Sequence, residues 1–247
     1  MKKSFVFALL ILLTGSVVYA QSDMGAGMFS LEGAVGFQWN RMKEGEAWSG
    51  GPAFTASVRF FVPGEGIALG FSIGVVYTFL TEMEYIVPDD SGGTQGIPPG
   101  GKITIKRDDA DSLYNLSIFA GLCLNAAATR NFAVVSDFGL AFSFDTAKWE
   151  KVLINTPANR KTLYSELSTN YLGLFARPGL QLRLSLVTFE AGVNVGYYFL
   201  KWNTVKSYIA DPQNKNNKEI IEDESGNFDM VNFIKIGAPY ISIGFKF

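Results

Sequence analysis

Apolar residues alternate with small or polar residues along most of this chain, and the alternation falls into eight segments. It is clearest between Ile67 and Thr81, where odd positions up to Phe79 are large and apolar and most even positions are small or polar. A period of two is typical of a β-strand with one apolar face. The eight predicted strands are Ala26–Arg41, Ala53–Val62, Ile67–Thr81, Ser112–Asn125, Phe132–Asp145, Asn170–Leu184, Thr188–Trp202 and Met230–Phe247.

The connections between these strands are alternately short and long. The short ones are Pro63–Gly66, Ala126–Asn131 and Ser185–Val187, and the long ones are Met42–Pro52, Glu82–Asp111, Thr146–Thr169 and Asn203–Asp229. A barrel that crosses an outer membrane has short periplasmic turns and longer extracellular loops. The pattern therefore predicts an all-β fold: a closed eight-stranded antiparallel transmembrane β-barrel with three short periplasmic turns and four long extracellular loops. The even strand number places both termini on the periplasmic side.

The second face of the strands indicates which side meets lipid. It is rich in Gly, Ala, Ser and Asn, which suit the narrow interior of a small barrel, so we expect the apolar face to point outward. Aromatic residues near both strand ends fit the two interfacial girdles of such a barrel. The alternative is a soluble periplasmic β-sandwich or a lipocalin-like barrel, whose outer face carries many charges and long polar groups.

Two prolines interrupt the alternation. Pro178 falls on the outward face of its strand, where its missing N–H removes a ladder hydrogen bond unless a bulge absorbs it. Near Ala238-Pro239 the apolar parity changes, because Ile234 and Ile236 lie on the opposite register to Ile241. We expect a β-bulge at this second position.

The first twenty residues have the features of a secretory signal peptide. Lys2 and Lys3 precede an apolar run from Phe5 to Leu13, and Val18-Tyr19-Ala20 supplies small residues where a signal peptidase needs them. The run is shorter than the roughly 20 apolar residues of a membrane-spanning helix. We therefore predict a cleavable signal peptide at 1–20 and one outer-membrane β-barrel at 21–247.

The net charge and the histidine and cysteine content reduce the number of functions that this chain can have. The 247-residue chain has a formal net charge of −2 and no basic stripe, so nucleic acid is not an expected partner. It has no histidine, which removes the usual general base and the commonest metal ligand. We expect no enzymatic activity, no catalytic residue, no cofactor and no metal site. The one cysteine, Cys123, is expected to be a buried apolar filler.

The long predicted loops contain two kinds of local signal. Ile103-Thr104-Ile105 alternates and predicts a hairpin arm that extends the barrel above the membrane. Asp108-Asp109-Ala110-Asp111 and Glu222-Asp223-Glu224 are acidic but lack the spacing and glycine of an EF-hand loop. We expect both acidic groups to be solvated loop residues.

Charged residues on the inward face form the candidate site. Charges on the lipid face of such a barrel cost several kcal/mol near the membrane midplane, so these side chains belong in the lumen. One interpretation is an ion-paired plug that fills a dry lumen, and the other is a selectivity constriction or gate. A permanently open pore is not expected, because eight strands leave room only for side chains. The residues are Glu32, Arg59, Asp137, Arg177, Arg183 and Glu190.

The chain ends in a terminal Phe with apolar residues at every second position before it, in the segment from Tyr240 to Phe247. With its eight predicted strands, the chain from Gln21 onward resembles the small eight-stranded outer-membrane proteins of the OmpW, OmpX and OmpA-transmembrane kind. The resemblance implies a place in the cell outer membrane, contact with its lipid, and insertion by the outer-membrane assembly machinery. The implied assembly signal comprises Tyr240, Ile241, Ile243, Phe245 and Phe247.

Two functions are compatible with this sequence. The leading hypothesis is a non-enzymatic integral outer-membrane barrel, a rigid anchor whose long surface loops contact an extracellular or host-surface ligand. The alternative is a narrow, porin-like channel of the OmpW kind for small or hydrophobic solutes. Its exit would lie sideways, near Pro178 or Pro239, where the sheet is weakened.

Overall fold

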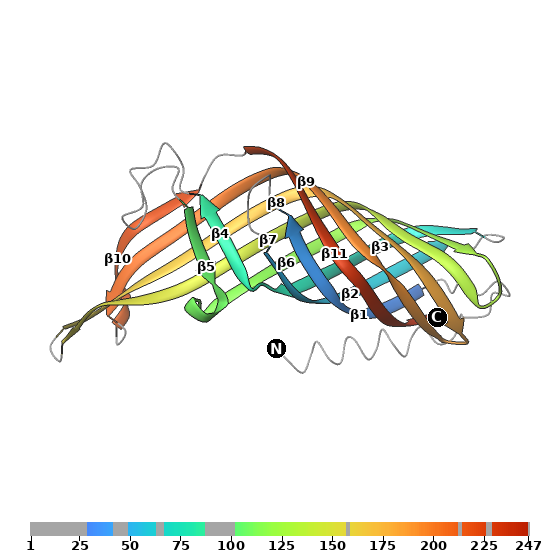
Figure 1. Ribbon diagram of the computed structural model, residues 1–247, viewed down its shortest axis with the longest axis horizontal. Coiled ribbons are helices and arrows are strands. Elements are labelled where there is room, and N and C mark those ends of the chain that lie inside the picture. Colours follow the sequence, from blue (N-terminus) through green and yellow to red (C-terminus); the bar gives the residue numbers. More distant parts are fainter. Residues whose placement is uncertain are drawn as a thin grey trace.

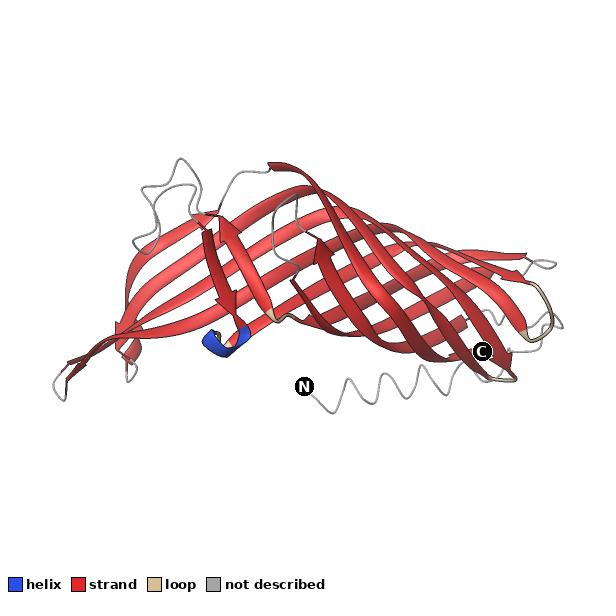
Figure 2. Ribbon diagram, viewed as in Figure 1, coloured by secondary structure: helices blue, strands red, loops and turns tan. Residues whose placement is uncertain are grey.

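The computed structural model describes residues 29–41, 49–62, 67–86, 102–156, 159–211, 214–225 and 229–246, and nearly all of them lie in β-strands (Figure 2). The predicted signal peptide, the turn Pro63–Gly66 and Phe247 lie outside these residues. Within the described residues no helix has the length and apolar character to span a membrane. The elements are β1 (Phe29–Arg41), β2 (Ser49–Val62), β3 (Ile67–Phe79), β4 (Glu82–Ile86), β5 (Lys102–Lys106), a 3₁₀ helix η1 (Arg107–Asp109), β6 (Ser112–Ala127), β7 (Phe132–Thr156), β8 (Asn159–Leu184), β9 (Val187–Asp211), β10 (Asn214–Ser225) and β11 (Asp229–Lys246).

Eight of the strands form a closed antiparallel ring. Its order is β1, β2, β3, β6, β7, β8, β9 and β11, and β11 pairs with β1 to complete it. Ser30 shows the closure, because it lies opposite Arg59 on one side and Lys246 on the other. The ring confirms the predicted fold class, and in the described part of the chain each ring strand has a neighbour on both sides, as a backbone within a membrane requires.

The two faces of the ring differ as predicted. Large apolar side chains point outward and stay exposed, with Phe71 67% and Leu180 66% exposed, whereas lumen-facing Arg59 and Asp137 are at most 1% exposed. This is the reverse of a lipocalin-like barrel and fits a wall surrounded by lipid. Outward aromatic residues gather near both ends of this wall, with Tyr77, Phe79, Phe144 and Trp202 on the extracellular side and Phe60, Phe132, Phe189 and Phe245 on the periplasmic side.

Three strands run far beyond the membrane, and here the prediction of loops was wrong. β7, β8 and β9 have 25, 26 and 25 residues, whereas crossing a bilayer takes roughly 9–11. The segment Thr146–Thr169 is the continuation of β7 and β8, with Lys148 opposite Glu166. Much of Asn203–Asp229 likewise continues β9 and forms β10, so a four-stranded sheet of β7, β8, β9 and β10 projects from the barrel (Figure 1). The alternation of these segments was hidden by their many polar residues.

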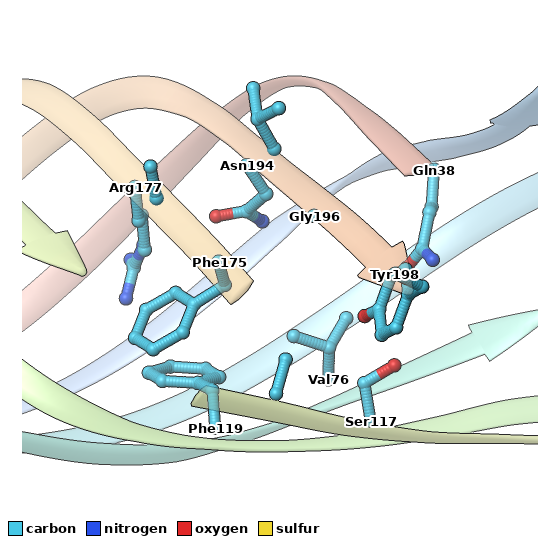
Figure 3. A pocket seen from close by; sticks show the side chains of 12 residues that line it. Gln38, Val76, Ser117, Phe119, Phe175, Arg177, Asn194, Gly196 and Tyr198 are labelled. Atoms are coloured by element: carbon cyan, nitrogen blue, oxygen red, sulfur yellow. The ribbon is translucent and has the colours of Figure 1, made fainter. Parts of the chain in front are cut away.

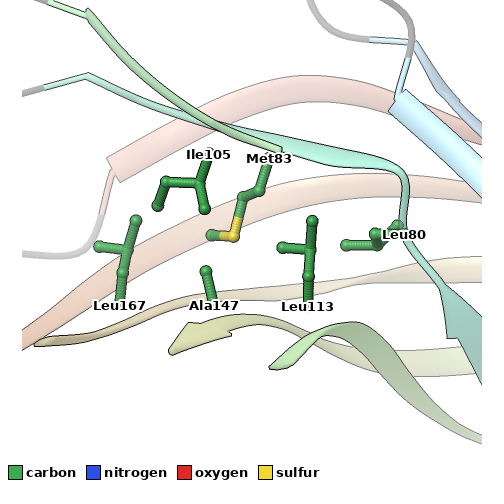
Figure 4. Close-up of a cluster of buried hydrophobic side chains, with 6 residues drawn as sticks. All are labelled: Leu80, Met83, Ile105, Leu113, Ala147 and Leu167. Atoms are coloured by element: carbon green, nitrogen blue, oxygen red, sulfur yellow. The ribbon is translucent and has the colours of Figure 1, made fainter. Parts of the chain in front are cut away.

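The segment Ile103-Thr104-Ile105 does lie in a hairpin, formed by β4 and β5, but the side chain of Ile105 turns toward the barrel. Met83 and Ile105 pack on lumen-facing residues of β6, β7 and β8 (Figure 4). The hairpin therefore covers the extracellular end of the lumen. The buried cluster comprises Leu80, Met83, Ile105, Leu113, Ala147 and Leu167.

Arg107 fastens this hairpin to the strands beneath it. Its Nη1 donates to the carbonyl of Leu113 at 3.0 Å, and its guanidinium lies 5.3 Å from the centre of the Phe79 ring. Its backbone N–H donates to the carbonyl of Thr81 at 2.9 Å. One arginine thus joins β3, η1 and β6.

Both predicted irregularities affect the wall, in different ways. β11 has register shifts against β9 and against β1 around Ala238-Pro239, which confirms the bulge. At Pro178 there is no bulge: β8 keeps its register with β9, but the ladder has no pair between Ala176 and Gly179. Because proline has no N–H to donate, the sheet loses bonds there instead of shifting.

The turn between β8 and β9 contains a strained residue. Ser185 has φ of 56°, a left-handed conformation that costs a residue with a Cβ roughly 1–2 kcal/mol. The two-residue connection forces it, since Leu184 pairs with Val187 directly across the turn.

Replacing Ser185 with Gly removes this steric cost, whereas Val at this site increases it. We expect the Gly variant to raise the free energy of unfolding by up to about 1 kcal/mol and the Val variant to lower it by about 1 kcal/mol or more. Urea unfolding of the refolded protein in detergent micelles measures both. Equal stability of the Gly and Val variants would contradict the assigned turn geometry.

Candidate functional site

The candidate site is the barrel lumen, and Arg59 of β2 lies at its centre. The guanidinium is fully buried and forms ion pairs with carboxylates from three other strands: Glu32 of β1 at 2.8 Å, Asp137 of β7 at 2.7 Å and Glu190 of β9 at 2.7 Å. Asp137 is held by a two-point fork, because Nε and Nη2 of Arg59 donate to its two oxygens at 2.9 and 2.7 Å. Arg59 therefore ties together opposite sides of the ring.

A second arginine completes this group. Nη2 of Arg177 lies 3.2 Å from Glu32, and its Nη1 donates to the Ser57 hydroxyl at 2.9 Å. The Arg177 guanidinium also lies over the Tyr240 ring, 4.3 Å from its centre, and the Tyr240 hydroxyl donates to Glu190. We call Glu32, Arg59, Asp137, Arg177 and Glu190 the lumen network.

The network includes five of the six predicted charged residues, and Arg183 lies apart. Arg183 is on β8 near the periplasmic turns, where its backbone N–H donates to the carbonyl of Asn131. Its side chain donates to the oxygens of Asn125 and Gln181 and forms no ion pair with a described carboxylate. The alternation along the strand predicted that Arg183 faces the lumen. It gave no information about the position of Arg183 along the barrel axis.

A small cavity of about 50 Å³ lies beside the network, toward the extracellular side (Figure 3). Phe119 and Phe175 pack against each other on one side of it, with ring centres 4.6 Å apart, and Tyr198 and Val76 lie on another side. The polar groups on its wall are Gln38, Ser117, Arg177 and Asn194. It is a largely apolar space with one cationic group at its edge.

The cavity reaches the weak part of the wall. Its lining includes Ala176 and Val195, which pair with each other at the point where the ladder between β8 and β9 stops. Asn194, next in β9, also marks the bulge, since its partner Gly237 precedes the register shift in β11. The same short stretch of β9 therefore loses regular pairing on both sides.

Further polar and apolar groups fill the lumen above the cavity. Asn115 donates to Ser143 at 2.7 Å and to Asp145 at 2.6 Å, and Thr78 donates to Gln38 at 2.8 Å. The hairpin of β4 and β5 covers this layer. The lumen is therefore filled in layers along the barrel axis. From the periplasmic to the extracellular end, these are Arg183, the lumen network, the cavity with its aromatic lining, the polar groups around Asn115 and the buried cluster under the β4–β5 hairpin.

The sequence interpretation missed the lumen aromatics. Phe119, Phe175, Tyr198 and Tyr240 occupy positions whose neighbours on the same face are mostly glycine, serine or asparagine. That contrast was a usable signal, because a narrow lumen fits a large ring only where facing residues are small. Gly74 illustrates the fit: a Cβ there would lie 2.4 Å from the Phe119 ring.

The structure also shows where the other residues named in the sequence analysis lie. Cys123 is buried with Phe61 and Ala68, as expected of an apolar filler. Asp108 and Asp109 lie exposed in η1, whereas Glu222-Asp223-Glu224 lies in strand β10 and not in a loop. Of the predicted assembly signal, Ile241, Ile243 and Phe245 point outward and Tyr240 points into the lumen. Among the described residues, no group of three or more His, Cys, Asp or Glu is placed to bind a metal ion.

The ring and its exposed apolar wall define the class of this protein: it is an eight-stranded antiparallel β-barrel of the transmembrane type. No family model and no curated protein matches the chain. Among solved structures, it is similar to Ail, the attachment invasion locus protein of Yersinia pestis, with 11% identity over 90% of this chain and 99% of that chain and a TM-score of 0.40. It is also similar to a major outer membrane protein from Thermus thermophilus, with 15% identity over 89% and 98% and a TM-score of 0.40. The chain's own geometry, a closed ring with an exposed apolar wall, defines the class.

Replacing Arg59 with Met removes the shared partner of three buried carboxylates. We expect a loss of about 3–5 kcal/mol in the free energy of unfolding, because uncompensated buried charge is costly. Urea unfolding in micelles measures it, with Arg130→Met in the exposed turn as the matched control. In planar bilayers the parent should be silent and the Arg59 variant should show conductance. Parent-like stability and silence in the Arg59 variant would contradict a central role for this side chain.

Proposed function

We propose that this protein is a non-enzymatic outer-membrane anchor that presents a rigid β-sheet to partners outside the cell. The observation that carries the proposal is the length of β7, β8 and β9, which pair with one another well beyond a membrane-spanning segment. A strand gains about 3.3 Å per residue, so some ten extra residues place the tip about 30 Å or more from the membrane-embedded wall. Binding sites commonly lie on such scaffold-supported tips.

The filled lumen supports an anchor in preference to an open pore. The guanidinium groups of Arg59 and Arg177 bridge the centre of the ring, and the hairpin of β4 and β5 covers the extracellular end. Eight strands enclose little more than their own side chains. Solute flow through the centre would require these contacts to break together.

The projecting sheet has edges suited to recognition. β10 ends the strand order, and the part of β7 beyond Lys148 has no pairing with β6 among the described residues. Exposed strand edges bind extended peptides by strand addition, with backbone hydrogen bonds supplying affinity. We propose an extended segment of an extracellular or host-surface protein as the partner. Contact with outer-membrane lipid through the apolar wall, and insertion by the assembly machinery through the last strand, belong to the same proposal.

Shortening the sheet tests this function. A variant in which Asn-Gly replaces residues 149–165 joins Lys148 to Glu166, which already face each other with an ion pair of 3.0 Å. The two-residue turn suits a hairpin closed at this pair. Cells displaying the parent should bind at least one of a panel of immobilised extracellular matrix proteins, and the shortened variant should lose that binding.

The control is the state of the barrel itself. The shortened variant should still migrate differently on gels before and after boiling, because the ring below Lys148 keeps its pairing. Parent cells that bind none of the panel, or a folded shortened variant that binds as well as the parent, would contradict the proposal.

The cavity favours a second candidate function, the binding or sideways passage of small apolar molecules. Its aromatic lining suits an apolar solute, and its position at the interrupted ladder between β8 and β9 gives a route toward the lipid. Arg177 at its edge suits a solute with one polar end. This function is compatible with a barrel that is closed along its axis.

Filling the cavity separates this candidate from the first. Ala141→Phe places a ring in the cavity, whereas Ala120→Phe makes the same change on the lipid-facing side of β6. With the apolar fluorophore N-phenyl-1-naphthylamine as probe, we expect saturable binding in the parent and in Ala120→Phe and its loss in Ala141→Phe. Equal binding in all three would place the probe in detergent and refute a lumen site.

A further inference from the structure

Arg183 is a buried cation without an anion among the described residues. Its side chain is 3% exposed, and Nη1 has no hydrogen-bond partner. Nε donates to the Gln181 oxygen at 3.2 Å and Nη2 donates to the Asn125 oxygen, both neutral acceptors. Burying a charge without a counter-charge is unfavourable, so this arrangement indicates a missing anionic partner.

Two hydroxyl groups without a hydrogen-bond partner lie at the same end of the barrel as Arg183. Thr188 of β9 is directly opposite Arg183, and Ser30 of β1 is opposite Lys246 of β11. The hydroxyl groups of Thr188 and Ser30 are buried and have no hydrogen-bond partner. Lys246 adds a second positive charge close enough to Arg183 to interact with it electrostatically.

The surrounding periplasmic end supplies no described carboxylate to this group. The turn between β6 and β7 contributes Arg130 and no acid, and the turn between β8 and β9 is Ser185-Leu186. Glu190, in the lumen network, is separated from Arg183 by Gln181, whose amide donates toward Glu190 at 3.5 Å while its oxygen accepts from Arg183. Water could satisfy the two hydroxyls, but it would leave the guanidinium charge uncompensated.

We propose that the periplasmic mouth of the barrel binds one phosphate-type oxyanion against Nη1 of Arg183. Its oxygens accept from the guanidinium and from the Thr188 hydroxyl, with Ser30 and Lys246 on the far side. Arginine is well suited to this contact, because its planar donors match the spacing of oxyanion oxygens. The group is either free phosphate or the phosphodiester of a phospholipid in the periplasmic leaflet, since both present the same oxygens. The site is independent of any function of the extracellular sheet.

Titration calorimetry of the refolded full chain in zwitterionic detergent, with inorganic phosphate as the probe, tests the site. We expect saturable binding by the parent and about tenfold or more weaker binding by Arg183→Gln, because a charge-assisted hydrogen bond is lost. Thr188→Val should weaken binding by a smaller factor, roughly twofold to tenfold. Arg130→Gln, which removes an exposed charge at the same end, should bind like the parent.

Gel mobility before and after boiling establishes that each variant is folded, and Thr188→Val keeps the test decisive if Arg183→Gln fails to fold. Competition with dihexanoyl phosphatidylglycerol then separates the sources of the anion. Displacement of phosphate by this short-chain lipid supports a headgroup site, and phosphate binding without displacement supports a free anion. Absence of phosphate binding by the parent, or binding that is unchanged in both Arg183→Gln and Thr188→Val, overturns the proposal.

Discussion

The pairing of β11 with β1 is the interaction on which the rest of the structure depends. A bilayer offers no hydrogen-bond partner to a backbone, so each strand at membrane depth needs a neighbour on both sides, and only a ring provides this. Once the ring closes, every second side chain is directed into a space that holds little besides side chains. The exposed apolar wall and the crowded polar lumen therefore both result from the pairing of β11 with β1, which closes the ring.

Within the lumen, charge has to be balanced across the ring and not along a strand. Arg59 meets carboxylates from β1, β7 and β9, which are far apart in sequence. The pairs with Asp137 of β7 and Glu190 of β9 couple β2 to strands with which it shares no backbone hydrogen bonds, so the group constrains the cross-section of the barrel as well as filling it. The same reasoning makes Arg183 unusual, because it is equally buried and has only amide oxygens as acceptors.

Parity along the strands was sufficient to predict the ring, the outward face and the lumen position of all six inward charges, because a period of two fixes the side of every residue. It did not predict which charges meet, since that depends on the stagger between strands, and Arg183 was grouped with residues that lie above it. The segment Thr146–Thr169 was predicted as a loop because it is rich in polar residues. It forms strands that extend above the membrane, where a β-strand needs no continuous apolar face. The lumen aromatics were overlooked because the inward face was interpreted from its small and polar residues alone, although Phe119 shares a face with Ser117 and Gly121.

The unbroken course of β7, β8 and β9 has a mechanical consequence. A load applied at the distal tip and directed away from the cell runs parallel to the strands, so the hydrogen bonds between them are sheared together instead of opening one after another. Sheets resist the first kind of loading far better than the second. A protein with this geometry can hold a tethered object against drag with no change in its membrane-embedded part, and its weakest point under sideways load is the stretch of β9 where pairing is interrupted on both flanks.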